Sequence, residues 1–303
     1  MSMFSDGKGK LKPVWAFVFS VILGALAFLV AGNIASEAAG DHAFRRELIF
    51  RALWAVLLLG IFIWLLTVGD HVEEHRIAAQ GLPRVKGWLK QFVMGIVLGF
   101  VLPALAVAPI YIWGHFRYKV LWTWSFLPNL VAVILTLLVG ALAEELMFRG
   151  FPFQHLEKGI GTAQAVVVLS LFYALLHLIN PAASVWGIAN TFLIGVLLTV
   201  AYLRTRALWL PWGIHFGWNT TLGLLFGLPV SGIRSFNLWI YTQAYGPQWL
   251  TGNLYGVEAA ATGTFAILIG ILLVSTLPAA KLPQPITQAS AEPAVESLSS
   301  IKS

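Results

Sequence analysis

Two glutamates and two histidines lie inside long apolar runs, where ionisable side chains are rare. Of the 13 acidic residues only Glu144 and Glu145 fall within such a run, and of the seven histidines only His177 and His215 do. Ionisable groups immersed in hydrocarbon are costly to bury and are usually retained for function. Carboxylates and imidazoles that share one cavity could activate a water molecule by general acid–base catalysis.

Helical geometry separates the roles of the two glutamates. At about 100° per residue, Arg149 lies about 40° from Glu145 and about 140° from Glu144 around the helix axis. Glu145 and Arg149 are therefore expected to form an i, i+4 ion pair. Glu144 is left without that partner, and an unpaired carboxylate in an apolar setting suits a general base that works near neutral pH.

The histidines also have polar neighbours at helical spacing. His215 and Asn219 are four residues apart, and so are Tyr173 and His177. Each pair therefore shares one face of its helix. Since buried polar groups must find partners, the economical arrangement is one cavity on which all three helices converge. The alternative is that the histidines are packing residues and that Asn219 only bridges helices by a hydrogen bond.

The spacing of Glu144 and His177 predicts a helical hairpin. The midpoint of the two residues falls within 159–161, which reads Gly-Ile-Gly. A turn there would place the two side chains at the same depth. It requires the first helix to continue, with a bend at Pro152, to about Lys158.

The elements that must position these residues are transmembrane helices. The chain has 303 residues, of which 58% are apolar and 11% are charged, whereas ordinary soluble domains carry about a quarter charged residues. The expected fold is all-α, a polytopic transmembrane bundle of about eight spans. The predicted spans are 14–34, 48–69, 92–113, 126–148, 162–179, 185–203, 207–227 and 259–277.

Positive charge predicts the orientation of this bundle. Predicted inner segments hold 13 of the Lys and Arg residues, and the outer segments with their margins hold 6, which places both termini in the cytoplasm. The outer set is Arg45, Arg46, Arg51, Arg117, Lys119 and Arg234. We expect a cytoplasmic N-terminal segment at 1–13, the bundle at 14–277 with the first span as an uncleaved anchor, and a disordered tail at 278–303.

Composition also restricts the chemistry and the partners. The chain contains no cysteine, so it has no disulfide, thiol nucleophile or thiolate metal site. Its net charge of +6 forms no basic stripe between exposed aromatics, which argues against nucleic acid as a partner. Glycines recur at four-residue spacing, as expected for tight helix packing inside the bundle: Gly95 and Gly99, Gly213 and Gly217, Gly223 and Gly227.

Three motifs in order resemble one known family. Residues 144–149 match the E-E-x-x-x-R signature of the CPBP proteins, which include type II CAAX prenyl proteases, Abi proteins and bacteriocin-processing enzymes. The second motif, F-x-x-x-H, is similar to the run from Tyr173 to His177, with Tyr in place of Phe. The third, H-x-x-x-N, is met by His215 and Asn219. The resemblance covers a core of about 84–277.

The resemblance implies an intramembrane endopeptidase of the glutamate or metallo class. Glu144 would activate a water, helped by His177, while His215 and Asn219 would hold the oxyanion or the water. The substrate would be a membrane-associated peptide or protein, with a prenylated C-terminal peptide as the namesake, and the location would be a bacterial cytoplasmic membrane. Oligomeric state is not predicted.

Several alternatives stay open at this stage. One version of the chemistry places zinc on Glu144, His177 and His215, and the other needs no metal. Glu145 is either a direct catalytic residue or the partner of Arg149 in a structural ion pair. Instead of an enzyme, the chain could be a non-catalytic membrane scaffold or immunity protein that retains the fold, or a transporter with an intramembrane proton relay.

Overall fold

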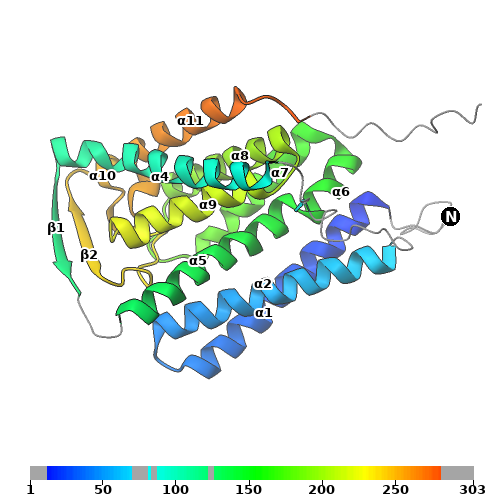
Figure 1. The fold of residues 1–303 in the computed structure, drawn as a ribbon, viewed down its shortest axis with the longest axis horizontal. Coiled ribbons are helices and arrows are strands. Elements are labelled where there is room, and N and C mark those ends of the chain that lie inside the picture. Colours follow the sequence, from blue (N-terminus) through cyan, green and yellow to red (C-terminus); the bar gives the residue numbers. More distant parts are fainter. Residues whose placement is uncertain (1–11, 70–80, 83–86, 122–125, 281–303) are drawn as a thin grey trace, which may run out of the picture.

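The chain folds into a helical bundle capped at one end by a two-stranded ribbon (Figure 1). A computed structural model describes residues 12–69, 81–82, 87–121 and 126–280. The longer helices are α1 (Pro13–Ala39), α2 (Ala43–Gly69), α4 (Trp88–Trp113), α5 (Phe126–Arg149), α7 (Thr162–Leu176), α8 (Val185–Thr205), α9 (Trp209–Thr220) and α11 (Ala261–Ser275). Shorter segments are α6 (Phe151–Ile160), η1 (His177–Ile179), η2 (Thr221–Leu225), α10 (Gln248–Thr251), η3 (Asn253–Tyr255) and η4 (Val257–Ala259).

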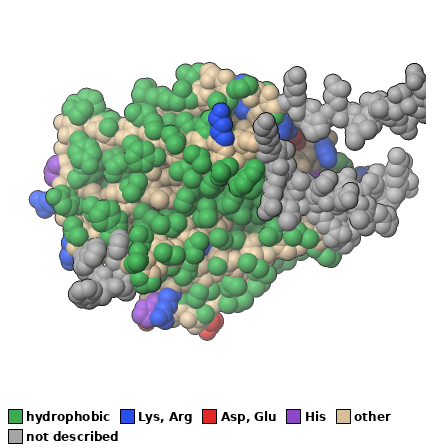
Figure 2. Space-filling view, viewed as in Figure 1, with side chains coloured by type: hydrophobic (Ala, Val, Ile, Leu, Met, Phe, Trp, Pro, Cys, Tyr) green, Lys and Arg blue, Asp and Glu red, His purple; other side chains and the backbone are tan. Residues whose placement is uncertain are grey.

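The helices are apolar and long enough to make this an integral membrane protein. Among the described residues, six segments could cross a bilayer: Pro13–Ala39, Ala43–Trp64, Trp88–Trp113, Leu127–Ile160, Thr162–Ile179 and Val185–Thr205. Hydrophobic side chains cover most of the face in Figure 2, and the charged ones gather mainly towards its margins. Such a surface suits lipid, because lipid is the solvent for the outer faces of a bundle.

The predicted all-α bundle is confirmed, with two refinements. The helices α9 and α11 have 12 and 15 residues, fewer than the roughly 20 that a full span needs, and they occupy the places of the seventh and eighth predicted spans. The strands β1 (His115–Val120) and β2 (Ile240–Tyr245) pair antiparallel, with His115 opposite Tyr245. The count of eight spans and the cytoplasmic termini stay predictions, and residues 1–11 and 281–303 lie outside the described ranges.

The predicted hairpin around residue 160 is present. Helix α5 continues into α6 after a short break at Gly150, so the segment Leu127–Ile160 is nearly continuous. Gly161 ends α6 with φ +91°, a left-handed conformation that glycine adopts without steric cost, and α7 begins at the next residue. The turn therefore brings α7 back along α5.

Close contact between α4 and α9 sets the depth of α9 in the bundle. A Cβ atom at Gly99 would lie 2.3 Å from the carbonyl oxygen of Ile214, and one at Gly213 would lie 2.3 Å from that of Phe92. The predicted role of these glycines in packing within the bundle is confirmed. Because their backbones nearly touch, α4 holds one side of α9 while α5 and α8 pack on the others.

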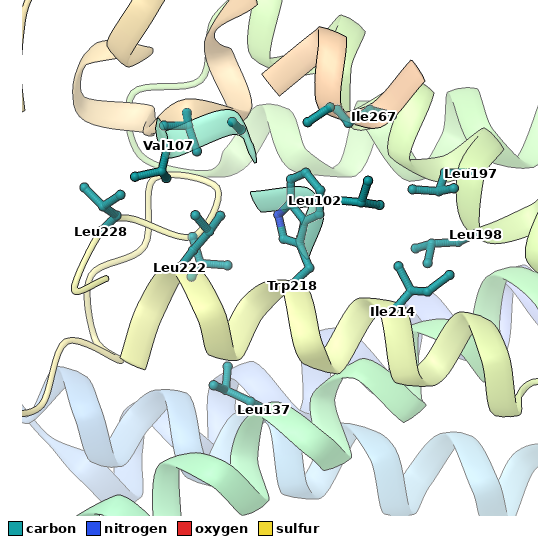
Figure 3. Close-up of a cluster of buried hydrophobic side chains, with 14 of the residues drawn as sticks. Leu102, Val107, Leu137, Leu197, Leu198, Ile214, Trp218, Leu222, Leu228 and Ile267 are labelled. Atoms are coloured by element: carbon teal, nitrogen blue, oxygen red, sulfur yellow. The ribbon is translucent and has the colours of Figure 1, made fainter. Parts of the chain in front are cut away.

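The short helix α9 lies at the centre of the larger apolar core. Figure 3 shows Ile214 and Trp218 of α9, and Leu222 of the following segment η2, among side chains from α4, α5, α8 and α11. A second apolar cluster fills the space between the α1–α2 hairpin and α5, α6 and α7. Helix α9 is thus surrounded by protein, and polar groups that it carries must find their partners inside the bundle.

Candidate active site

The polar residues singled out by the motifs meet at one cavity. Glu144 of α5, Tyr173 of α7, His177 at the end of α7, and His215 and Asn219 of α9 all line it. The cavity has a volume of about 40 Å³. Since one water needs roughly 10–15 Å³ of such volume, the cavity has room for about three waters.

His215 lies between the two adjacent glutamates. Its Nδ1 is 2.8 Å from Glu145 Oε1, and its Nε2 is 3.6 Å from Glu144 Oε2. A carboxylate can only accept a hydrogen bond, so Nδ1 carries the hydrogen and donates it to Glu145. In the neutral ring, Nε2 is then an acceptor directed at the side of the cavity that Glu144 occupies.

Glu145 stands behind His215 and does not line the cavity. Its side chain is fully buried, and Arg149 Nη1 donates to Glu145 Oε1 at 3.3 Å, so the predicted ion pair is confirmed. Arg149 is fixed in turn by α8, since it donates to the Gly195 carbonyl at 3.0 Å and to Thr199 Oγ1 at 3.3 Å. Of the predicted site residues, Glu145 therefore contacts the imidazole of His215 from behind and has no surface on the cavity.

His177 ends α7 and keeps one nitrogen available to the cavity. Its Nδ1 is 2.8 Å from the carbonyl oxygen of Tyr173, so Nδ1 carries the hydrogen and Nε2 is left as an acceptor. The Tyr173 ring packs against His177 with a centroid distance of 4.6 Å and against His215 at 6.5 Å. The tyrosine in the second motif thus serves as the wall between the two imidazoles.

Glu144 is not unpaired, contrary to the expectation from helix geometry. Arg51 of α2 donates from Nη1 to Glu144 Oε1 at 3.2 Å. The sequence-based interpretation placed Arg51 among the outer topology charges, because spacing within one helix says nothing of partners from another. The second oxygen, Oε2, is buried and accepts no hydrogen bond from the described part of the chain.

A second carboxylate, which the sequence did not indicate, lines the cavity. Glu258, in η4, is 2% exposed and accepts from Trp218 Nε1 at 2.9 Å and from Ser231 Oγ at 3.1 Å, and also from the Ser231 backbone N–H. Burial raises the pKa of the Glu258 carboxyl. The available signal is its position directly before the last predicted span, 259–277.

Glu258→Gln should lower the stability of the protein by about 1–3 kcal/mol, because the new NH₂ group would face an N–H donor on one side or the other. The measurement is the thermal unfolding midpoint in detergent. Glu37→Gln, at an exposed position on α1, is the matched control and should leave the midpoint unchanged. Equal unfolding midpoints for both variants would contradict a stabilising role for the hydrogen bonds that Glu258 accepts from Ser231 and Trp218.

The zinc set considered from the sequence, Glu144, His177 and His215, stays a prediction, and the surroundings of Glu144 bear on it. Within the described residues, no group of three or more His, Asp or Glu side chains is arranged to hold a metal ion. The Arg51 guanidinium also contacts Glu144, the carboxylate of the predicted set, at 3.2 Å. A cation held so close would repel a second one, since like charges in a low-dielectric interior interact strongly.

Comparisons with known proteins agree with the motif resemblance over its central part. Residues 124–221 match the family model described as Type II CAAX prenyl endopeptidase Rce1-like. An Escherichia coli relative, described as an uncharacterized 24.3 kDa protein, is 31% identical over 104 residues, which are 33% of this chain and 46% of the relative. The match thus spans about half the length of that relative. No solved structure matches the chain.

The matched segment is narrower than the predicted core of 84–277, yet it contains all three motifs, from Glu144 to Asn219. It excludes α2 with Arg51, and it excludes Glu258. The residues that converge on the cavity from α5, α7 and α9 therefore lie within the matched segment. Over this segment, the match and the three motifs together support membership in the Rce1-like type II CAAX prenyl endopeptidase family.

Proposed function

We propose that the chain is an intramembrane endopeptidase in which Glu144 activates a water for attack on a peptide bond. The observation that carries the proposal is the state of Glu144 Oε2, a buried oxygen with no hydrogen-bond partner among the described residues, beside a cavity large enough for water. A general base needs a free acceptor atom within reach of the proton it takes.

The tautomers of the two histidines suggest a separate role for each residue at the cavity. A water in the cavity gives one proton to Glu144 while its oxygen attacks the carbonyl carbon. The acceptor Nε2 of His177 orients the other hydrogen of that water. Asn219, whose amide has two N–H donors, stabilises the oxyanion of the tetrahedral intermediate. Glu144 then passes its proton to the leaving amine, and the C–N bond breaks.

His215 has a supporting role in this scheme. With Nδ1–H donated to Glu145, its Nε2 is an acceptor 3.6 Å from Glu144 Oε2. A proton taken up by Glu144 can therefore be shared with His215. This arrangement keeps the transferred proton inside the cavity until the amine leaves.

The chemistry is proposed to proceed without a metal. Incubation with EDTA or phenanthroline should leave the cleavage rate of the purified protein unchanged, because Arg51 already offsets the charge of Glu144. Metal analysis of the same sample should find less than one zinc per chain. A rate that is lost on chelation and restored by added zinc would contradict this part of the proposal.

The substrate is proposed to be a membrane-associated or prenylated peptide, cleaved in a bacterial cytoplasmic membrane. The family description names a prenyl endopeptidase, and the cavity is built from helices of a membrane bundle. We propose the lipid bilayer and a protein substrate within it as partners, with no nucleic acid.

The test is cleavage by the purified chain in proteoliposomes. Farnesylated C-terminal peptides and the same peptides without the lipid are incubated with wild type and with Glu144→Gln, and new termini are identified by mass spectrometry. Cleavage by the wild type alone would support the proposal. A folded wild type that cleaves none of the peptides and no membrane protein substrate would favour a non-catalytic scaffold or immunity protein instead.

A further inference from the structure

We infer that Arg51, which lies on α2 outside the segment matched by the family model, is a positioning residue that fixes the general base Glu144. The inference rests on the proposed function, because it concerns how the base is held. It extends the site to the α1–α2 hairpin, which carries none of the three motifs.

Arg51 is held on several sides within the described structure. It is 8% exposed, its Nε donates to Glu47 Oε1 at 2.6 Å, and its Nη1 donates to Glu144 Oε1 at 3.2 Å. Its guanidinium carbon also lies 5.4 Å from the centre of the Phe236 ring. These contacts fix the orientation of the guanidinium. Its hydrogen bond then fixes the position of Glu144 Oε1.

Helix α5 has a space for the Arg51 side chain one turn before Glu144. A Cβ atom at Gly140 would lie 2.8 Å from Arg51 Cδ and 2.9 Å from Arg51 Nη1. Glycine in the middle of a helix costs roughly 1 kcal/mol relative to alanine. The gap at Gly140 lets the guanidinium cross the surface of α5 to reach the glutamate.

The geometry assigns different tasks to the two oxygens of Glu144. Oε1 is bound by Arg51, while Oε2 is left without a hydrogen bond and faces His215 Nε2 at 3.6 Å. Arg51 also offsets part of the cost of burying a carboxylate in an apolar bundle. The result is a base with one anchored oxygen and one oxygen available to take a proton.

The rival interpretation is an ion pair that only joins α2 to α5, and three variants separate the two. Arg51→Met is expected to lower kcat by about 10- to 100-fold with little change in KM, since small displacements of a catalytic group have effects of that size. Arg51→Lys keeps a positive charge near Glu144, on a shorter side chain with a single ammonium group. Its kcat should therefore lie between those of Arg51→Met and the wild type.

Gly140→Ala provides a second route that keeps the arginine. Its methyl group should displace the Arg51 side chain and lower kcat, while alanine itself favours the helix. Gly60→Ala on α2 is the matched control, because a Cβ atom there meets nothing within 4 Å, and it should cleave like the wild type. If Arg51→Met does not fold, Gly140→Ala decides the question.

The experiment is steady-state cleavage in proteoliposomes with the thermal midpoint measured on each sample. Lower kcat at an unchanged midpoint for Gly140→Ala supports positioning. A wild-type kcat for Arg51→Met and Gly140→Ala overturns it, whatever happens to the midpoint. Glu144→Gln in parallel separates the two claims: if it is inactive the proposed function stands without Arg51, and if it is active the proposed function itself fails.

Discussion

Glu144→Gln is expected to lower kcat for peptide cleavage by about 10²- to 10⁴-fold, with little effect on KM. Glutamine has nearly the same shape, so the cavity keeps its form, but the amide cannot take a proton from water at neutral pH. The measurement is the initial rate of cleavage by purified protein in proteoliposomes, over a range of substrate concentrations.

The matched control is Glu157→Gln on α6. Glu157 belongs to the same extended helical segment and pairs with Arg206 at 2.8 Å, but it does not line the cavity. It should therefore cleave at the wild-type rate. A Glu144→Gln rate close to that of Glu157→Gln would contradict the assignment of Glu144 as the base.

Glu145→Leu is expected to destabilise the fold by about 3–5 kcal/mol, because it leaves the buried Arg149 charge without its partner. Activity should fall as well, since His215 Nδ1 loses the acceptor that fixes its tautomer. The measurements are the free energy of unfolding in detergent and the cleavage rate of the fraction that remains folded.

A double variant separates the two roles of Glu145 that the sequence left open. Glu145→Leu with Arg149→Met removes both charges, and replacing a buried ion pair by apolar side chains is often neutral for stability. We expect stability to recover and activity to stay low, because His215 still lacks its acceptor. Recovery of both would mean that Glu145 is only a partner in an ion pair.

The motif residues could be predicted because each depends on spacing within one helix or one hairpin. The i, i+4 pairing of Glu145 with Arg149 follows from helix geometry alone, and it is present. The meeting of Glu144 and His177 follows from a hairpin centred near Gly161, which the sequence also marks. Local rules were sufficient for these contacts.

The contacts of Arg51 and Glu258 could not be predicted in the same way. Arg51 reaches Glu144 across 93 residues of sequence, by the packing of α2 on α5. Glu258 lies at the cavity because the segment after α9 folds back over it. There its carboxylate accepts hydrogen bonds from Ser231 and from Trp218 of α9. Both contacts depend on tertiary packing. In the sequence, a charged residue near the end of an apolar run is equally consistent with a residue that only marks the membrane boundary.

The length of α9 is a third feature that the sequence obscured. The apolar run 207–227 is long enough for a span, yet the α-helix ends at Thr220 and a π-helical turn follows. The run is apolar because protein surrounds it, as Figure 3 shows for Ile214, Trp218 and Leu222. Apolar length alone does not distinguish burial in protein from exposure to lipid.

A water held among Glu144, His177 and His215 is central to the proposed mechanism, so the most direct test is a density map of the protein in nanodiscs at a resolution that shows ordered water. We predict a water within hydrogen-bonding distance of Glu144 Oε2 and of His177 Nε2, with Arg51 on the other carboxylate oxygen. A map in which Glu144 turns away from both histidines, or in which side chains fill the space between them, would contradict the account.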